Sequence, residues 1–280
     1  MGVGQSGFPA ARLAQALLLL TLCLSGVALF AQDSDADISP AQPSGITPEE
    51  IIRRFAAREK EFKEARAQYT YRQDAKVQTL NGSTVDGEYR MVVDITFDES
   101  GRRVEQVVFA PQPTLRRIGM SREDVDDLEK RLPFVLTSDE VGEYNILYVG
   151  QQRVDELDTY VFDISPKIIE KGRRYFEGRI WVDNQDFQIV KTHGKSVPDI
   201  RKKNDENLFP KFTTYREQID GKYWFPTYTR ADDTLTFSSG DVRIRMIVKY
   251  TNYKRFGAKV RITYEGQEIP KGEKQEEPPK

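Results

Sequence analysis

Apolar and polar residues alternate along residues 85–98 of the chain, with Val92 as the exception. One side of this run is apolar and the other carries mostly charged residues, which is the pattern of a strand with one buried face. Residues 69–79 repeat the pattern, and Asn81-Gly82 between the two runs is typical of a hairpin turn. The two runs therefore predict a long antiparallel hairpin.

Similar runs continue to the end of the chain and are separated by short polar turns. We interpret as further strands residues 104–110, 145–154, 158–165, 174–183, 187–193, 212–219, 223–231, 242–253 and 259–264. Together with the hairpin they give about eleven strands in series, and a meander of that size is expected to curl rather than stay flat.

Helical periodicity appears twice. Residues 47–67 begin with Thr47-Pro48-Glu49-Glu50, a capping box with proline in the first turn, followed by apolar residues at helical spacing: Ile51, Phe55, Phe62 and Ala65. A second, shorter helix is expected within residues 112–142, capped by Ser121 and carrying a small apolar stripe of Val125, Leu128 and Leu132. We expect this insertion to cover one mouth of the sheet as a lid, which makes the fold mainly β (α+β).

Both ends of the chain differ from this domain in composition. Residues 16–30 are nearly all apolar, follow a single Arg12, and precede Ala31 and a polar run, which is the order of a cleaved signal peptide over residues 1–31. An uncleaved N-terminal anchor is the alternative, although the apolar run is short for a membrane span. Residues 32–46 and 265–280 have the composition of a disordered linker and tail, which leaves residues 47–264 as the domain.

Composition removes several kinds of chemistry. The 280 residues hold 42 Lys and Arg against 44 Asp and Glu, so a net charge of -2 gives no basic field for nucleic acid. One Cys and one His cannot build an ordinary zinc site, and Cys23 lies in the apolar run of the signal peptide, so the mature chain has no cysteine. No phosphate-binding glycine loop is present, and we expect no metal and no cofactor.

Reactive side chains offer little evidence of an enzyme. Any nucleophilic triad would need His193, which lies in KTHGKS without a matching motif and is interpreted as an exposed turn residue. The acidic run 123–129 is interpreted as a solvated helix face rather than a calcium site, and no carboxylate pair is singled out for glycoside hydrolysis. The basic clusters 171–174 and 201–203 are interpreted as solvated loops, with contact to anionic lipid or an acidic partner as the alternative.

The apolar side of the strands is the remaining candidate site. It encloses volume that the helices either fill, as an ordinary core, or leave partly open for an acyl chain. Strand parity assigns to this ligand-binding face Tyr89, Met91, Val93, Phe97, Phe162, Ile164, Ile180, Trp224, Tyr228, Met246 and Val248.

Several short segments of the sequence are similar to segments in the outer-membrane lipoprotein-sorting superfamily of Gram-negative bacteria. This superfamily includes a periplasmic carrier and its receptor. The segments are the helix start at residues 47–52, the hairpin of residues 69–97, and the strand–turn phrases at residues 176–183, 187–191, 221–226 and 250–253. The resemblance covers about residues 47–264 and rests on turns and strand cores rather than on a catalytic motif. It implies an unclosed β-barrel of about eleven strands with a helical lid.

Through this resemblance we expect a non-enzymatic periplasmic protein that holds acyl chains of lipoproteins or other amphiphiles in outer-membrane lipoprotein sorting or envelope lipid transfer. The alternative is an interaction or sensor module that uses this same fold to bind an envelope protein. The chain is longer than a typical carrier, chiefly in residues 112–142 and in the loop of residues 200–208, and it lacks a lipobox.

Overall fold

The computed structural model describes residues 1–2, 38–98, 102–202 and 205–255. In chain order the elements are α1 (Pro48–Arg66), β1 (Tyr69–Asn81), β2 (Thr84–Phe97), β3 (Arg103–Phe109), α2 (Arg122–Lys130), the 3-10 turn η2 (Val141–Glu143), β4 (Tyr144–Val154), β5 (Leu157–Pro166), β6 (Tyr175–Asp183), β7 (Ile189–Val197), β8 (Ile200–Lys202), β9 (Asp205–Asn207), β10 (Phe212–Ile219), β11 (Tyr223–Phe237) and β12 (Gly240–Arg255).

Ten strands form one antiparallel sheet in the order β3-β2-β1-β12-β11-β10-β7-β6-β5-β4. Within the described part of the chain the sheet does not close, because β3 and β4 lie at its opposite edges. This confirms the expected unclosed, mainly β fold with a helix at its N-terminal side. Each of the ten strands corresponds to one predicted strand, and the eleventh, residues 259–264, lies outside the described residues.

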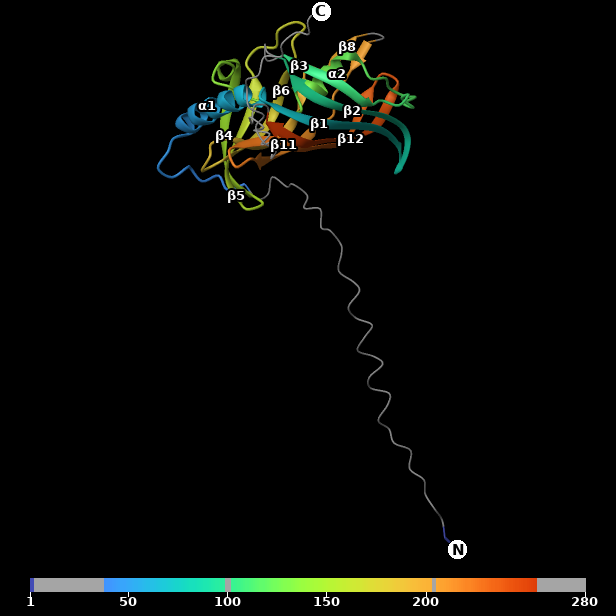
Figure 1. Cartoon of the computed structure of the whole chain (residues 1–280), viewed down its shortest axis with the longest axis horizontal. Coiled ribbons are helices and arrows are strands. Elements are labelled where there is room, and N and C mark those ends of the chain that lie inside the picture. Colours follow the sequence, from blue (N-terminus) through green and yellow to red (C-terminus); the bar gives the residue numbers. More distant parts are fainter. Residues whose placement is uncertain (3–37, 99–101, 203–204, 256–280) are drawn as a thin grey trace, which may run out of the picture. The chain divides into compact units, whose positions relative to one another are not determined.

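Register decides which side chains share a face of this sheet. Ala75 of β1 lies opposite both Met91 of β2 and Val248 of β12, so all three point to the same side. That side is the inner face, where the largest cluster of buried apolar residues gathers. The two helices also contribute to this cluster, through Ile51, Phe55, Leu128 and Leu132. Figure 1 shows them over different parts of the sheet, α1 in blue and α2 in green.

Helix α1 is held against the sheet by aromatic side chains. The predicted stripe is buried as expected, with Phe55 and Phe62 fully inaccessible. The ring of Phe55 lies 5.8 Å from that of Phe162, and the ring of Phe62 meets the ring of Phe225 edge-on at 5.1 Å. Burying a phenylalanine in this way contributes about 1.5–3 kcal/mol per side chain. The sequence pattern therefore identified the contact face of α1 correctly.

A buried ion pair also joins α1 to the sheet. Glu59 and Arg216 are both buried and approach to 3.0 Å, and Glu59 also accepts from the backbone N–H of Ile189. Arg216 donates to the carbonyl oxygen of Phe134 and lies over the ring of Phe62. Burial raises the pKa of Glu59, and the neighbouring guanidinium opposes that rise. Periodicity gave no sign of this pair, because a charged residue on a helix is normally exposed.

The outer face differs between the two parts of the sheet. On β1, β2, β11 and β12 it carries charged residues that pair across strands, as in Arg72–Asp94, Arg90–Asp74 and Arg243–Asp232. On β5, β6 and β7 it carries a buried apolar cluster of Val161, Trp181 and Val190. Both faces of that second part therefore hold apolar side chains, which weakens any assignment of faces from alternation alone.

Three local expectations need correction. Thr47 caps α1 by accepting from the N–H of Glu50, but the Glu50 carboxylate accepts from Arg53 and Arg54 instead of closing the predicted capping box. Residues 200–208, expected as a loop, contain the short hairpin β8–β9. His193 lies within β7 rather than at a strand end. In the first case two guanidinium groups within one helical turn compete successfully for the carboxylate.

Residues 38–42 lie within the range expected as a linker and contact β4. Ser39 and Gln151 exchange backbone hydrogen bonds, and Tyr148 donates to the carbonyl oxygen of Ala41. This segment covers part of the β4 edge of the sheet. The expected signal peptide, except for Met1 and Gly2, and the expected tail lie outside the described residues.

Candidate functional site

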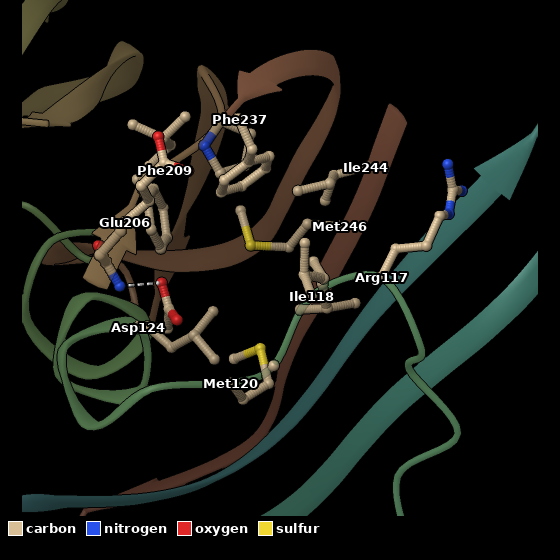
Figure 2. A pocket seen from close by; sticks show the side chains of 15 residues that line it. Arg117, Ile118, Met120, Asp124, Glu206, Phe209, Phe237, Ile244 and Met246 are labelled. Carbon is tan, nitrogen blue, oxygen red and sulfur yellow. Dashed lines mark hydrogen bonds between the residues drawn. The ribbon is translucent and has the colours of Figure 1, made fainter. Parts of the chain in front are cut away.

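A cavity of about 210 Å³ lies on the inner face of the sheet, at the α2 end. Figure 2 shows it between the strands of the sheet, the segment that carries Arg117 and Met120, and Asp124 of α2. Its walls come from β1, β9, β11, β12, α2, the connector before α2, and the segment between β9 and β10. The lining residues are Val77, Arg117, Ile118, Gly119, Met120, Asp124, Leu128, Glu206, Asn207, Leu208, Phe209, Pro210, Phe237, Ile244 and Met246.

The floor and the mouth of this cavity differ in character. Val77, Leu128, Ile244 and Met246 are all less than 10% exposed and make an apolar floor. The partly or fully exposed lining residues come from the connector and from the first turn of α2, together with Glu206 and with Phe237 of β11. The cavity therefore has an apolar interior and a mouth where its charged side chains lie beside apolar ones, an arrangement suited to an amphiphilic ligand.

Gly87 allows the connector to reach the cavity. Thr114 of the connector exchanges hydrogen bonds with the backbone of Glu88, so the chain crosses the end of β2 closely. A Cβ atom at position 87 would lie 2.9 Å from the Cα of Leu115 and 2.9 Å from the hydroxyl of Thr79. A side chain there would push the connector away from the sheet, so a strand glycine shapes the wall of the cavity.

A buried polar network lies beneath α2. Asp127 accepts from Arg174 at 2.8 Å and from the hydroxyl of Ser196 at 2.8 Å, and Arg174 also donates to the side-chain carbonyl of Asn207. Burial raises the pKa of Asp127 to about 6, against the opposing effect of Arg174. The side-chain amide of Asn207 donates to Asp124, so the network reaches the cavity wall. These bonds fix α2 over the sheet and hold Asp124 in place.

The structure distributes the eleven predicted site residues over three environments. Met246 lines the cavity. Five others are buried in the main core, and Tyr89, Met91 and Phe97 are partly buried against it; the five are Val93, Phe162, Ile164, Ile180 and Val248. The buried residues of this face pack against the two helices, and the cavity described above lies at the α2 end.

Trp224 and Tyr228 lie on the other side of the sheet, so their assignment to the inner face was wrong. Trp224 packs against the outer apolar cluster and donates through its indole N–H to Asp186, while Tyr228 lies opposite Lys249 and stacks on Tyr215. The inner positions of β11 are instead the odd-numbered ones, such as Phe225 and Thr229. Both faces of this strand carry aromatic residues, so alternation alone could not choose between them.

Most of the cavity-lining residues were not predicted. Val77 and Ile244 could have been found, because they share a face with Met246 in the alternation of their strands. Leu128 belongs to the predicted stripe of α2 but was not placed over a pocket. Residues 117–120 and 208–210 lie in connectors, where neither helical nor strand periodicity marks the buried side chains. Their contribution depends on the path of the chain.

The single histidine of the chain does not line the cavity. His193 is exposed on β7, and its Nδ1 lies 2.9 Å from the hydroxyl of Thr213. Among residues 38–98, 102–202 and 205–255, no set of three His, Cys, Asp or Glu side chains is placed to hold a metal ion. In the same part of the chain, no helix has the length and apolar character that a membrane crossing requires.

No family model matches the chain, and no curated protein sequence matches it. Several solved structures are similar to it, and three of them are as follows. A DUF1329 family protein from Desulfovibrio piger is 15% identical, with a TM-score of 0.40 over 74% of this chain and 93% of the other. A LolA superfamily protein from Nitrosomonas europaea is 20% identical, with a TM-score of 0.33 over 74% of this chain and 92% of the other.

The third is a putative outer-membrane lipoprotein-sorting protein domain from Vibrio parahaemolyticus, 11% identical, with a TM-score of 0.33 over 71% of this chain and 91% of the other. The superfamily that the sequence resembles is therefore among the similar structures.

Proposed function

We propose that the protein is a non-enzymatic carrier or binding protein, exported to the periplasm, that holds an alkyl chain of an envelope amphiphile in the cavity at the α2 end of the sheet. The observation that carries this proposal is the combination of an apolar floor, formed by Val77, Leu128, Ile244 and Met246, with a mouth that carries charged side chains. A ligand with a hydrocarbon part and a polar head matches both features.

The size of the cavity limits what it can hold. Its volume of about 210 Å³ exceeds the ~150 Å³ of an apolar cavity known to take benzene, but it is below the 300–1,000 Å³ usual for drug-sized ligands. One short alkyl segment fits, whereas the several acyl chains of a lipoprotein would need volume that α1 now fills. Each buried methylene contributes about 0.8 kcal/mol, so a short segment supports reversible binding of moderate affinity.

A variant that fills the cavity tests this proposal. Val77→Phe adds a ring to the floor, and we expect at least about a tenfold loss of affinity for a fluorescent alkyl probe, with little change in unfolding free energy because the ring enters empty space. Leu147→Phe is the matched control, because Leu147 is 67% exposed on β4 and does not line the cavity. Mass spectrometry of natively purified protein would show which lipid copurifies. Equal probe binding by the wild type and Val77→Phe would contradict the proposal.

The second candidate is an interaction module for an envelope protein, and the exposed edge strand β3 favours it. Val104, Val107, Val108 and Phe109 are each between 45% and 59% exposed on this strand. Within the described residues β3 is an edge strand of the sheet, and an apolar edge strand is a common site for strand addition. Val107→Lys would abolish such binding and leave the probe affinity of the cavity unchanged, so a pull-down with this variant separates the two functions.

A further inference from the structure

The charges around the cavity mouth bear on the head group of the ligand. Three charged side chains line the cavity: Arg117, Asp124 and Glu206. In Figure 2 Arg117 lies on one side of the cavity, and Asp124 and Glu206 lie on the other. Which of these groups has capacity left for a ligand follows from the bonds that each one already makes.

Arg117 is committed to the sheet. Its guanidinium donates to the backbone carbonyl of Leu80 at 2.8 Å and forms an ion pair with Asp86 at 3.0 Å. Asp86 also accepts from the hydroxyl of Thr79, and these contacts lower its pKa. These bonds are made through Nη2, and the carboxylate of Asp86 already offsets the charge of the guanidinium, which weakens its attraction for an anionic head group.

The N-terminus of α2 is also occupied. A helix N-terminus normally favours an anion through its free N–H groups and its dipole. Here the Ser121 hydroxyl accepts from the N–H of Asp124, and the Asp124 carboxylate accepts from the N–H of Ser121. Glu123 adds a second acid to the same turn. The chain itself supplies the negative charge that a ligand anion would otherwise bring.

Asp124 still has capacity as an acceptor. Its carboxylate accepts from the N–H and the hydroxyl of Ser121 and from the amide of Asn207. A carboxylate offers about four acceptor positions, so about one remains for a donor at the mouth. Glu206 is bonded to the N–H and hydroxyl of Ser238 and lies 3.9 Å from Arg201, and it is the second acid that lines the cavity.

We propose that the cavity selects alkyl ligands whose head group donates hydrogen bonds and is cationic or neutral, and that it discriminates against fatty-acid anions. This inference rests on the proposed function, because it assumes that an alkyl chain occupies the cavity. The alkyl chain would lie on the floor near Met246, and the head group would donate to Asp124 at the mouth. A carboxylate head would meet two acids and a guanidinium that is already paired.

Three ligands with the same alkyl chain test the selectivity: octylamine, octanol and octanoate, each measured by displacement of a neutral fluorescent alkyl probe at pH 7. We expect octylamine to bind at least about tenfold more tightly than octanoate, with octanol between them. Equal affinities, or tightest binding of octanoate, would overturn the inference while supporting the proposed function. Binding of none of the three, together with no probe binding, would overturn the proposed function itself.

A charge variant locates the selectivity. In Asp124→Asn we expect the preference for octylamine over octanoate to fall by about fivefold or more, because the carboxylate at the mouth is lost. Glu123→Gln is the matched control: it removes the same charge from the same helical turn, but Glu123 is exposed and does not line the cavity. An unchanged preference in Asp124→Asn, or an equal fall in Glu123→Gln, would overturn the assignment to Asp124. If Asp124→Asn does not fold, the order of the affinities of the wild type for the three ligands tests the inference by itself.

Discussion

The two helices cover the same face of the sheet with opposite results. Under α1 the concave face is filled, because its 19 residues deliver Phe55 and Phe62 into contact with sheet aromatics. Under α2, which has 9 residues, the aliphatic Leu128 reaches the sheet and a cavity of about 210 Å³ remains. The difference shows that helix length and side-chain size decide whether an apolar face becomes a core or a site.

Both helices are nevertheless anchored by the same chemistry. Glu59 of α1 pairs with Arg216 of β10, and Asp127 of α2 pairs with Arg174 just before β6. The four side chains are at most 11% exposed. A buried carboxylate–guanidinium pair fixes the position of a helix but adds little net stability, because each group loses its hydration on burial. The two pairs therefore fix where each helix lies, and packing supplies most of the stability.

The largest expected effect comes from breaking the α1 pair on one side. Arg216→Met leaves Glu59 buried without its partner, and we expect a loss of about 3–5 kcal/mol in unfolding free energy, measured by urea denaturation. The double variant Glu59→Leu/Arg216→Met removes both charges and is expected to recover most of that loss. A loss below about 1 kcal/mol in the single variant would show that water reaches the pair.

The contrast in packing is tested by two truncations that each remove three carbons. Ile51→Ala under α1 creates a new cavity in a filled region and is expected to cost about 4 kcal/mol. Leu128→Ala under α2 enlarges an existing cavity whose walls can relax, so its cost is expected at about 2 kcal/mol. Calorimetric or urea unfolding measures both. Equal costs would mean that the two ends of the concave face are packed alike.

The α2 anchor is expected to respond to pH. The pKa of Asp127 is raised from 3.8 to about 6 in the folded protein, so the folded state binds more protons than the unfolded state between these values. Stability from this group is therefore present at low pH and is lost as the pH rises toward 6. A shift of about two units corresponds to about 3 kcal/mol at most. The test is the unfolding free energy of the wild type minus that of Asp127→Asn, measured across this interval.

We expect this difference to fall with rising pH. Contributions from carboxylates whose pKa is lowered, such as Asp74 and Asp232, run in the opposite direction and cancel between the two proteins. A difference that is constant with pH would show that Asp127 titrates with an ordinary pKa.

The smallest effect is expected on the outer charged face. Arg243→Ala removes a half-exposed ion pair with Asp232, and its cost should stay below about 1 kcal/mol and shrink further in high salt. A larger, salt-insensitive loss in thermal unfolding would indicate that this surface is not solvated. The surface ion pairs would then resemble the buried ion pairs in their contribution to the unfolding free energy.

Strand identity was predicted well and face assignment less well, for a physical reason. On β2 polar residues occupy one side, so alternation placed Val93 correctly on the inner face. On β11 aromatic residues occupy both sides, and register with β12 decided that Tyr228 points outward. Alternation of apolar and polar residues identifies the buried face of a strand only where the opposite face is exposed to water.

The sequence by itself predicted the ten strands and the two helices of the described residues and their caps at Thr47 and Ser121, because the patterns that mark these elements lie within a few consecutive residues. It also excluded ordinary zinc chemistry through its single Cys and single His. The tertiary structure alone decided where the enclosed volume stays open and which charges surround it. Those properties depend on side chains far apart in the chain, such as Met246, Asp124 and Glu206, and on a connector path that no periodic pattern encodes.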